Sequence, residues 1–224
     1  MASFRFEMVA CVGAGFVLSA CESTLLPPPE LPVLEIADKT CVSEVDLSEA
    51  VSLTPEKERK WYDLRTPVNA ETPCIGEGEA AANYVVYALP EHGPNHVVTI
   101  GGQKQPIRIL APAVTTLNED GSVSREFDAE EFMELGNAYA AQLRPRETER
   151  YILVKTNPTL VGETLEGMEV RLMSGTNYVS TSAGGATYTT YSGAESSASR
   201  TFSHEGVIGV RIQARSGKVG IPEE

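Results

Sequence analysis

The residues best suited to nucleophilic chemistry lie in a serine-rich run near the end of the chain. Serines recur between Ser192 and Ser199, and His204 follows a few residues later. A serine nucleophile needs an oriented base. The Gly-x-Ser-x-Gly motif, which often presents such a serine, is missing. The pattern therefore favours a polar loop or an exposed hairpin over a hydrolase site.

Carboxylates are the second candidate for catalysis. The acidic cluster from which a glycosidase pair could be drawn comprises Asp120, Glu126, Asp128, Glu130 and Glu131. Glycoside hydrolysis needs two carboxyl groups at a defined separation across a cleft, and the sequence singles out no such pair. A solvated acidic face is the better interpretation.

Phosphate, metal and redox sites are also unsupported. Gly76-Glu77-Gly78 and the Gly206–Gly209 pair lack the Lys-Ser/Thr or strand–helix context of a phosphate loop, so they predict turns or close-packing glycines. Three His residues and no Cys-x-x-Cys motif are too little for a metal site. We therefore predict a non-enzymatic protein with no catalytic residue, metal or cofactor.

The chemistry that the sequence does indicate is lipid attachment. Leu18-Ser19-Ala20-Cys21 closes a short apolar run that begins at Met8 and follows Arg5. The run is shorter than the roughly 20 apolar residues of a membrane span, and its small final residues suit a signal peptidase. The motif resembles the lipobox of bacterial lipoprotein precursors, which implies cleavage before Cys21 and acylation of its sulfur. An ordinary secretory signal with a coincidental cysteine is the alternative.

Residues 1–20 are accordingly predicted to be a signal peptide, and residues 21–40 a lipidated cysteine with a proline-rich spacer. The stretch from Thr24 to Val33 favours a semi-rigid polyproline conformation. Stable anchoring needs more than one acyl chain, and the lipoprotein modification supplies three. Lipoprotein sorting usually retains in the inner membrane those lipoproteins that have Asp directly after the lipidated cysteine. By analogy, Glu22 at this position indicates the outer membrane and a periplasmic location.

Two cysteines remain once Cys11 leaves with the signal peptide and Cys21 carries lipid. Cys41 and Cys74 would reach an oxidising compartment, so we expect them to form a disulfide. Two free, buried thiols are the alternative.

The charge of the chain excludes one class of partner. The formal net charge is −13, and an acidic chain is repelled by phosphate backbones, so nucleic acid is not an expected partner. About 204 residues follow the signal peptide, enough for one large domain. With no second domain boundary visible, we predict one domain over residues 41–215 and a loose tail over 216–224.

Short apolar segments between turn residues predict a mainly β fold. A segment apolar on both faces is typical of a central strand, and Asp120-Gly121 predicts a hairpin turn. Gly184-Gly185 is suited to turn another hairpin within the Ser-, Thr-, Gly- and Ala-rich segment from Ser174 to Ser203. The expected strands include Tyr84–Leu89, His96–Ile100, Ile107–Leu110, Val114–Leu117, Ser122–Phe127, Arg150–Thr156 (central) and Gly206–Ala214.

One helix is expected after the Asp120-Gly121 hairpin. Asp128 is a good N-cap; Phe132, Leu135 and Tyr139 recur at helical spacing; and Pro145 would end the helix. The predicted architecture is therefore an antiparallel β-sandwich with one short helix.

Aromatic residues offer the best candidate binding surface. Tyr178, Tyr188 and Tyr191 lie in a polar segment, where flat rings beside hydroxyl and amide groups suit a sugar or a partner protein. Trp61 and Tyr62 are expected to pack in the core or beside the disulfide.

Several segments together resemble a known family. They are Val51–Thr54, Asn83–Pro90, Pro112–Asn118, Arg150–Thr156 and Gly206–Ile212. Their order resembles that of the maltose-operon periplasmic protein (MalM-like) family, over most of residues 45–214. The resemblance implies an envelope protein linked to sugar uptake, without a catalytic motif to transfer. Longer relatives continue past the last strand.

We therefore expect a lipid-anchored, non-enzymatic envelope protein, an accessory or binding module for carbohydrate uptake of the maltose or maltodextrin type. Its partners would be the membrane, through lipid on Cys21, and a glycan or an envelope protein. The alternative is a structural interaction protein of an outer-membrane assembly.

Overall fold

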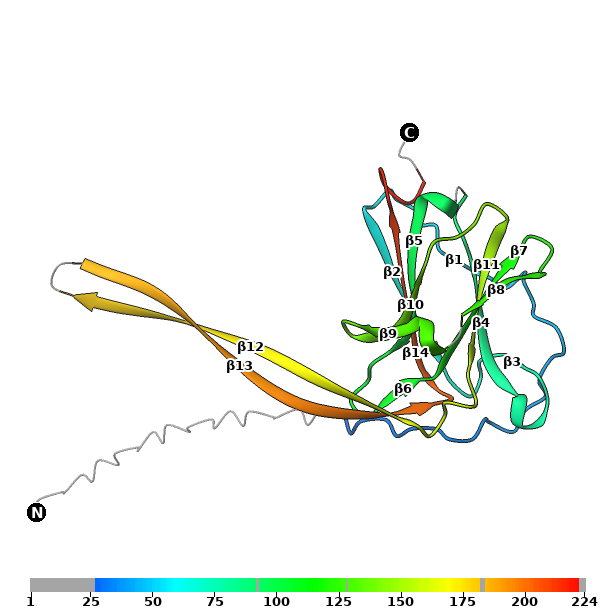
Figure 1. Cartoon of the computed structure of the whole chain (residues 1–224), viewed down its shortest axis with the longest axis horizontal. Helices are drawn as coiled ribbons and strands as arrows, with labels where there is room; N and C mark the ends of the chain where they lie inside the picture. Colours follow the sequence, from blue (N-terminus) through cyan, green and yellow to red (C-terminus); the bar gives the residue numbers. More distant parts are fainter. Residues whose placement is uncertain (1–26, 92, 128, 182–183, 222–224) are drawn as a thin grey trace, which may run out of the picture.

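The computed structural model describes residues 27–91, 93–127, 129–181 and 184–221. They form two facing β-sheets, here called the sandwich, and a long two-stranded arm that projects from one end of it (Figure 1). The predicted mainly β, sandwich-type fold is confirmed.

The first sheet has the strand order β1-β4-β11-β7-β8, with β3 beside β4. β11 is central and antiparallel to both neighbours, as its two apolar faces predicted. β7 and β8 form the hairpin predicted around Asp120-Gly121, with Gly121 at a φ of 81°. The strands are β1 (Val51–Ser52), β3 (Cys74–Ile75), β4 (Ala82–Ala88), β7 (Pro112–Asn118), β8 (Val123–Phe127) and β11 (Glu149–Thr156).

The second sheet has the strand order β2-β14-β5-β10-β9, and every neighbouring pair is antiparallel. The strand predicted over Gly206–Ala214 is therefore confirmed as β14, between β2 and β5. The strands are β2 (Trp61–Val68), β5 (His96–Gln103), β9 (Phe132–Leu135), β10 (Ala138–Leu143) and β14 (Gly206–Ala214).

Apolar side chains from the inner faces of the two sheets form the main core. In β14, for example, Ile208, Val210 and Ile212 are buried while Arg211 and Gln213 are exposed. Full burial of one such aliphatic side chain stabilises the fold by about 1.5–3 kcal/mol. A smaller cluster on the outer face of the first sheet consists of Tyr84, Val86, Leu117 and Leu153, covered by Val45, Leu47 and their neighbours. This second cluster explains why β11 is apolar on both faces.

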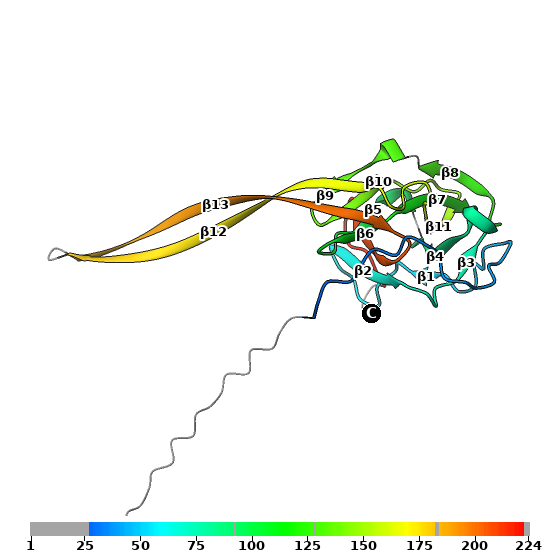
Figure 2. The ribbon, with the colours of Figure 1, turned by 90° about the horizontal axis from the view of Figure 1, so that it is seen from below.

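The arm is a hairpin of β12 (Thr164–Thr181, 18 residues) and β13 (Gly184–Ser203, 20 residues). Ordinary strands have about 5–6 residues, whereas β12 extends for about 60 Å at roughly 3.3 Å per residue. Both views show the arm reaching away from the sandwich (Figure 1, Figure 2). A hairpin was predicted here, but Gly184 and Gly185, which were expected to form its turn, lie in β13 opposite Thr181 and Ser180. The length of the hairpin and its separation from the sandwich were not predicted.

In the described part of the chain, the arm is joined to the sandwich at its base. There β13 pairs in parallel with β6 (Arg108–Leu110), and Phe202 is buried in a small cluster with Ile109 and Ala111. Tyr139 of β10 contacts the Phe202 ring edge-on, at 5.2 Å between centroids. These contacts hold the start of the arm rigidly against β10.

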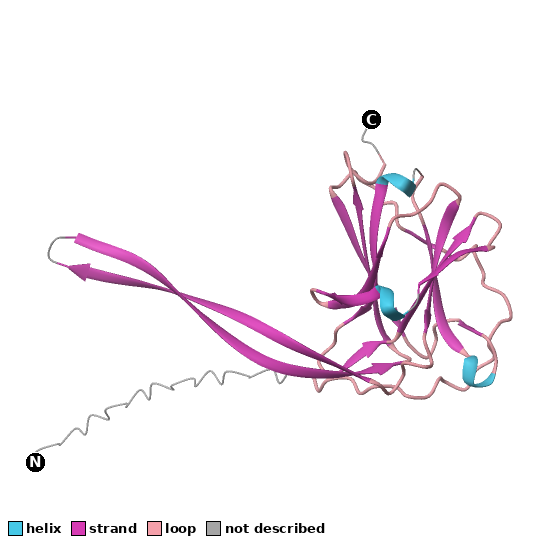
Figure 3. Ribbon diagram, in the orientation of Figure 1, coloured by secondary structure: helices cyan, strands magenta, loops and turns pink. Residues whose placement is uncertain are grey.

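The helix predicted from Asp128 toward Pro145 is wrong. Asp128 lies outside the described residues, Ala129–Glu131 form only a 3-10 turn (η3), and β9 and β10 follow as a hairpin (Figure 3). Gly136, at a φ of 59°, and Asn137 make its two-residue connection, a recognised hairpin turn. Within the described residues the other helical turns are also 3-10: η1 (Gly78–Ala80) and η2 (Gly93–Asn95).

The proline-rich spacer is shorter than predicted. The side chain of Glu30 forms an ion pair with Arg108. The backbone N–H of Val33 donates to Ser203 Oγ at 2.9 Å, and its carbonyl accepts from the His204 N–H at 2.9 Å. From Glu30 to Val42 the chain, here called the N-terminal segment, thus lies on the sandwich, and a free spacer ends by Pro29.

Part of the tail predicted to be loose is also attached. Val219 is buried and forms a β-bridge with Arg59, and the Ile221 N–H donates to the carbonyl of Pro55 at 3.2 Å. Residues 216–221 therefore belong to the folded structure, while 222–224 lie outside the described residues.

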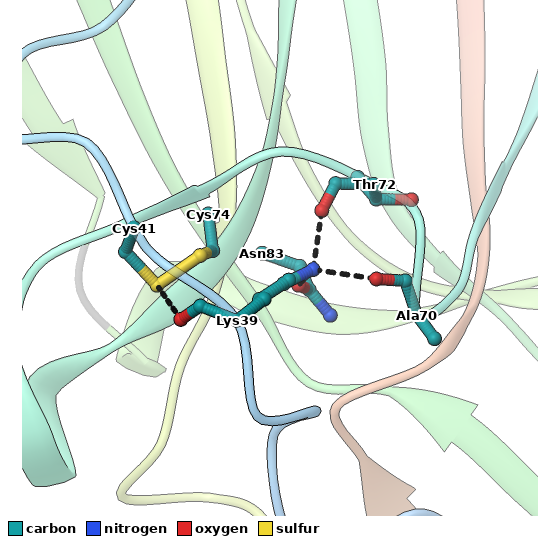
Figure 4. Close-up of a disulfide and its surroundings, with 6 residues drawn as sticks. All are labelled: Lys39, Cys41, Ala70, Thr72, Cys74 and Asn83. Carbon is teal, nitrogen blue, oxygen red and sulfur yellow. Dashed lines mark hydrogen bonds between the residues drawn. A yellow bond between two sulfur atoms is a disulfide. The ribbon is translucent and has the colours of Figure 1, made fainter.

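Cys41 and Cys74 form the predicted disulfide, with 4.7 Å between their Cα atoms (Figure 4). The bond joins the N-terminal segment to β3. Beside it, Lys39 Nζ donates to the carbonyls of Ala70 and Thr72 and to Asn83 Oδ1. Burial lowers the pKa of Lys39, against the opposing effect of the Glu205 and Glu71 charges. One covalent bond and one partly buried cation therefore fasten this segment.

Replacing Cys41 tests the contribution of the disulfide. The bridge spans 33 residues of sequence separation, so the chain-entropy model gives a stabilisation of about 3–4 kcal/mol. We expect Cys41→Ser to lower the melting temperature by about 10 °C in oxidising buffer. The same scan in reductant serves as the control, in which the variant and the native chain should melt together. An equal gap in both buffers would assign the cysteines a packing role.

Candidate functional site

The outer face of the second sheet carries a groove of about 540 Å³. It crosses β2, β14, β5 and β10, and the turn between β9 and β10 contributes to its wall. Its polar lining residues are Asp63, Arg65, Thr99, Gln103, Asn137, Gln142, Arg211 and Gln213. Such a lining supplies many hydrogen-bond donors and acceptors on a rigid floor.

Cross-strand register sets four of these residues in one row across the sheet. Asp63 is opposite Arg211, Arg211 is opposite Thr99, and Thr99 is opposite Gln142. Directly opposite residues share a face of a sheet, and Gln142 Nε2 donates to Thr99 Oγ1 at 3.2 Å. The row therefore presents a carboxylate, a guanidinium, a hydroxyl and an amide in sequence.

The next row has small residues in its middle. Arg65 is followed across the sheet by Gly209, Gly101 and Ala140. A Cβ on Gly209 would lie 2.7 Å from Gln103 Cγ, so the glycine leaves room for this side chain on the floor of the groove. The hollow is thus a consequence of small residues between rows of long polar ones.

Asp63 and Arg211 form a preorganised charge pair in the groove. Arg211 Nε donates to Asp63 Oδ1 at 2.6 Å and Nη2 to Oδ2 at 2.9 Å. These bonds lower the pKa of Asp63, with a further contribution from the charges of Arg211 and Arg65, and they raise the pKa of Arg211. Arg65 has no ion-pair partner among the described residues, so the groove carries a local positive excess on an acidic protein.

Trp61 lies at the edge of this face and not in the core, contrary to expectation. It is opposite Gln213 in the register, and half of its surface is exposed (50%). Tyr62, the next residue along β2, packs against the main core as predicted. An exposed indole beside polar groups suits a ligand that is polar on its edges and apolar on one face.

Among the residues whose side chains the structure describes, no serine-type site is assembled. Ser199 is exposed on β13, about 16 Å along an extended strand from His204. His204 is buried; its carbonyl accepts from Asn83 Nδ2 and Thr156 Oγ1, and burial lowers its pKa. Its Nδ1 has no hydrogen-bond partner among the described residues. The serines of the run lie on a hairpin strand, as the polar pattern predicted.

Four of the five acidic candidates are solvated, as predicted, and Asp128 lies outside the described residues. Asp120 accepts two hydrogen bonds from Ser122 within its turn, and Glu126, Glu130 and Glu131 are exposed. None of these four lines the groove. The glycines singled out earlier make turns or close contacts: Gly76 and Gly78 have positive φ values of 94° and 56°, and Gly206 approaches the Leu110 backbone.

The buried carboxylate of the structure is one that the sequence did not reveal. Glu149 at the start of β11 is 1% exposed. Its oxygens accept from Arg125 Nε and Nη2, both at 2.8 Å, and from the Arg146 N–H at 2.7 Å. The hydroxyls of Thr116 and Ser124 also donate to it. With five donors, this side chain is a structural tie between β7, β8 and β11.

The three candidate tyrosines do not gather on one face. In the hairpin register, Tyr178 is opposite Thr187, Tyr188 is opposite Asn177 and Tyr191 is opposite Ser174. Alternation along a strand gives Tyr178 and Tyr191 positions on one face and Tyr188 a position on the other. The backbone of the arm therefore offers no single platform made of all three.

Cys21 and the predicted signal peptide lie outside the described residues. Among the residues that the structure describes, no helix has the length and apolarity to cross a membrane. The same residues contain no group of three or more His, Cys, Asp or Glu side chains placed to hold a metal ion.

Comparison with known proteins gives no further guide. No family model matches the chain, and neither a curated protein nor a solved structure matches it. The functional argument therefore depends on the residues themselves.

The Glu149 tie predicts a specific acid sensitivity. Burial alone would raise the pKa of Glu149, but the hydrogen bonds from Arg125, Arg146, Thr116 and Ser124 outweigh it and lower the pKa to about 2. A lowered folded-state pKa stabilises the fold above the unfolded value of 4.5, and this contribution, roughly 3 kcal/mol, is lost as the pH falls from 4.5 toward 2.

We expect Glu149→Gln to reduce the free energy of unfolding by about 3 kcal/mol at pH 7, because Arg125 loses its partner. The difference from the native protein should shrink as the pH is lowered toward 2 in denaturant titrations. Glu126→Gln, an exposed carboxylate on β8, is the matched control and should change little. A pH-independent difference for Glu149→Gln would contradict the assignment.

Proposed function

We propose that this protein is a non-enzymatic, lipid-anchored envelope protein that binds carbohydrate in the groove on the second sheet. It would act as an accessory or binding module for carbohydrate uptake of the maltose or maltodextrin type. The single observation that carries this proposal is the groove, with its row of polar side chains and an exposed indole at its edge.

The chemistry of the groove suits a sugar better than an apolar ligand. Hydroxyl groups of a sugar both donate and accept, which matches the amides of Gln142 and Gln213 and the hydroxyl of Thr99. The Trp61 ring is suited to an apolar sugar face, and the groove volume is in the usual range of about 300–1,000 Å³ for small-molecule sites. The ion pair between Asp63 and Arg211 fixes the Arg211 guanidinium as a hydrogen-bond donor in the groove and provides no activated nucleophile.

The location and the sugar class come from the sequence. The Leu18–Cys21 motif supports acylation of Cys21, Glu22 supports the outer membrane, and the resemblance to the MalM-like family supports a link to maltodextrin uptake. The disulfide is compatible with an oxidising compartment such as the periplasm.

A second candidate function is a structural role in an outer-membrane assembly. The observation that favours it is the arm, because a hairpin of 18 and 20 residues, packed on the sandwich at its base around Phe202, adds surface that projects beyond the sandwich. Groove and arm are separate surfaces, so the two candidates can be tested separately.

The lipid anchor predicts a cysteine-specific change in membrane association. Cys21→Ser should release the mature chain into the soluble fraction, because the variant lacks the Cys21 thiol to which the lipid would be attached. Cys11→Ser is the matched control: the same substitution within the predicted signal peptide should leave the protein in the membrane. Intact mass after extraction should show a start at Cys21 with added acyl mass. Tight membrane association of Cys21→Ser would refute the anchor.

The groove predicts loss of sugar binding in two variants. We expect maltodextrin to bind the native protein. Trp61→Ala and Arg65→Ala should each raise the dissociation constant at least about tenfold, which corresponds to a loss of about 1.4 kcal/mol of binding free energy. Arg144→Ala removes an exposed arginine outside the groove and should bind as the native protein does. Isothermal titration calorimetry measures all four.

Two results would contradict the groove as the site. One is equal affinity of all four proteins for maltodextrin. The other is binding that survives Trp61→Ala and Arg65→Ala but is lost in Tyr178→Ala or Tyr191→Ala, which would transfer the site to the arm.

A further inference from the structure

The arm has long strand edges that no described strand covers. In its sheet the strand order is β12-β13-β6, so the outer edge of β12 has no neighbouring strand among the described residues. The outer edge of β13 is taken by β6 only at Thr201–Ser203. In a sheet edge, alternate residues direct backbone N–H and C=O groups outward, ready to pair with another strand.

The usual devices that protect such an edge are missing from the outer part of the arm. Natural edges carry Lys or Pro, are short, or are interrupted by bulges. Neither β12 nor β13 contains Lys or Pro. Their register runs from Thr164↔Thr201 to Thr181↔Gly184 without a shift. A two-stranded ribbon of this kind is only marginally stable in water by itself, so it gains from a further strand.

The outer part of the arm is also free of charge. From Leu172 to Ala194 the sequence contains no Asp, Glu, Lys, Arg or His, and no other stretch without Asp, Glu, Lys or Arg is as long. The rest of the chain carries the whole formal net charge of −13. Two copies share this negative net charge, and this part of the arm adds no charge of either sign to an approach between them.

We infer that the arm is a self-association element, in which the outer edge of β12 between Leu172 and Thr181 pairs with the arm of a second copy of this chain. A second copy fits best because the uncharged edge is identical on both molecules, so two copies that share a net charge of −13 bring no like charges together along it. Backbone pairing supplies the affinity, and the hydroxyl-rich sequence needs no complementary charge. The new strand also relieves the marginal stability of the isolated ribbon.

This inference rests on the second candidate function, assembly, and not on sugar binding. The arm and the groove share no lining residue: the groove lies on β2, β14, β5, β10 and the β9–β10 turn. Loss of self-association would therefore leave maltodextrin binding intact, and failure of sugar binding would leave the assembly measurable.

The experiment compares two identical substitutions on β12. Thr176 and Thr164 are both exposed and occupy the same face of the strand, but only Thr176 lies in the uncharged part. Thr176→Lys installs the residue that natural edges use against pairing. The purified full chain and both variants are measured in detergent by light scattering over a wide concentration range, with melting temperature as the control for folding.

The expected result is a particle of at least two chains for the native protein and for Thr164→Lys. For Thr176→Lys the dissociation constant of the assembly should rise at least about tenfold, while the melting temperature of the sandwich is unchanged. Native protein that remains a single chain at every concentration overturns the inference. So does assembly that persists in Thr176→Lys but is lost in Thr189→Lys, which would assign pairing to β13. Capture of a different protein by the arm of single chains would also overturn it.

Discussion

The alternation of side chains along the strands of the second sheet determines both the core and the groove. In β14, Ile208, Val210 and Ile212 fill the space between the sheets, so Gly209, Arg211 and Gln213 must face outward. A shift of one residue in the register would bury Arg211 and expose the isoleucines, which the hydrophobic effect forbids. The burial of one face therefore fixes the order of polar groups on the other. The Asp63–Arg211–Thr99–Gln142 row is a result of the same register that builds the core.

The N-terminal segment sets where a lipid anchor would leave the sandwich. Glu30, the residue that binds Arg108, lies against β6, and β6 pairs with the base of β13. With Cys21 acylated, residues 22–29 would lie between the lipid and this point, and the nine Cα–Cα steps from Cys21 to Glu30 reach at most about 32 Å. The disulfide and Lys39 then hold the next stretch against β3 and Asn83. The proposed anchor thus starts beside the base of the arm.

Local patterns were sufficient for most strands, because a buried strand shows its alternation directly. Arg150–Thr156 and the Asp120-Gly121 hairpin are examples. The helix failed because Phe132 and Tyr139 satisfy helical spacing and also stack across a hairpin, at 5.5 Å between ring centroids. Gly136-Asn137 was the decisive turn pair, and its hairpin chemistry outweighed the N-cap at Asp128.

The groove was harder to predict than the strands that carry it. Its polar residues come from positions between 63 and 213, and each appears in the sequence only as the exposed half of an alternating strand. Which strands are neighbours is decided by long-range packing, so Asp63 and Arg211 could not be paired from spacing. The position of Trp61, whose ring was expected in the core, was missed because the sequence does not show which face of β2 is buried. Trp61, Asp63 and Arg65 alternate along β2 and therefore share its outward face. Glu149 was missed because its five donors come from three separate segments.

The β9–β10 hairpin contacts both the groove and the base of the arm, although these two surfaces share no lining residue. Leu135, Gly136 and Asn137, at the turn of the β9–β10 hairpin, line the groove. Two residues after Asn137, Tyr139 packs between Phe132 and Phe202, and Phe202 belongs to the base of the arm. Gly102 of β5 allows β6 to approach closely here, because a Cβ on Gly102 would lie 2.3 Å from the Leu110 carbonyl oxygen. A close-packed contact of this kind transmits displacement and does not absorb it. Any load that an assembly places on the arm is therefore borne first by the hairpin that forms the end of the binding groove.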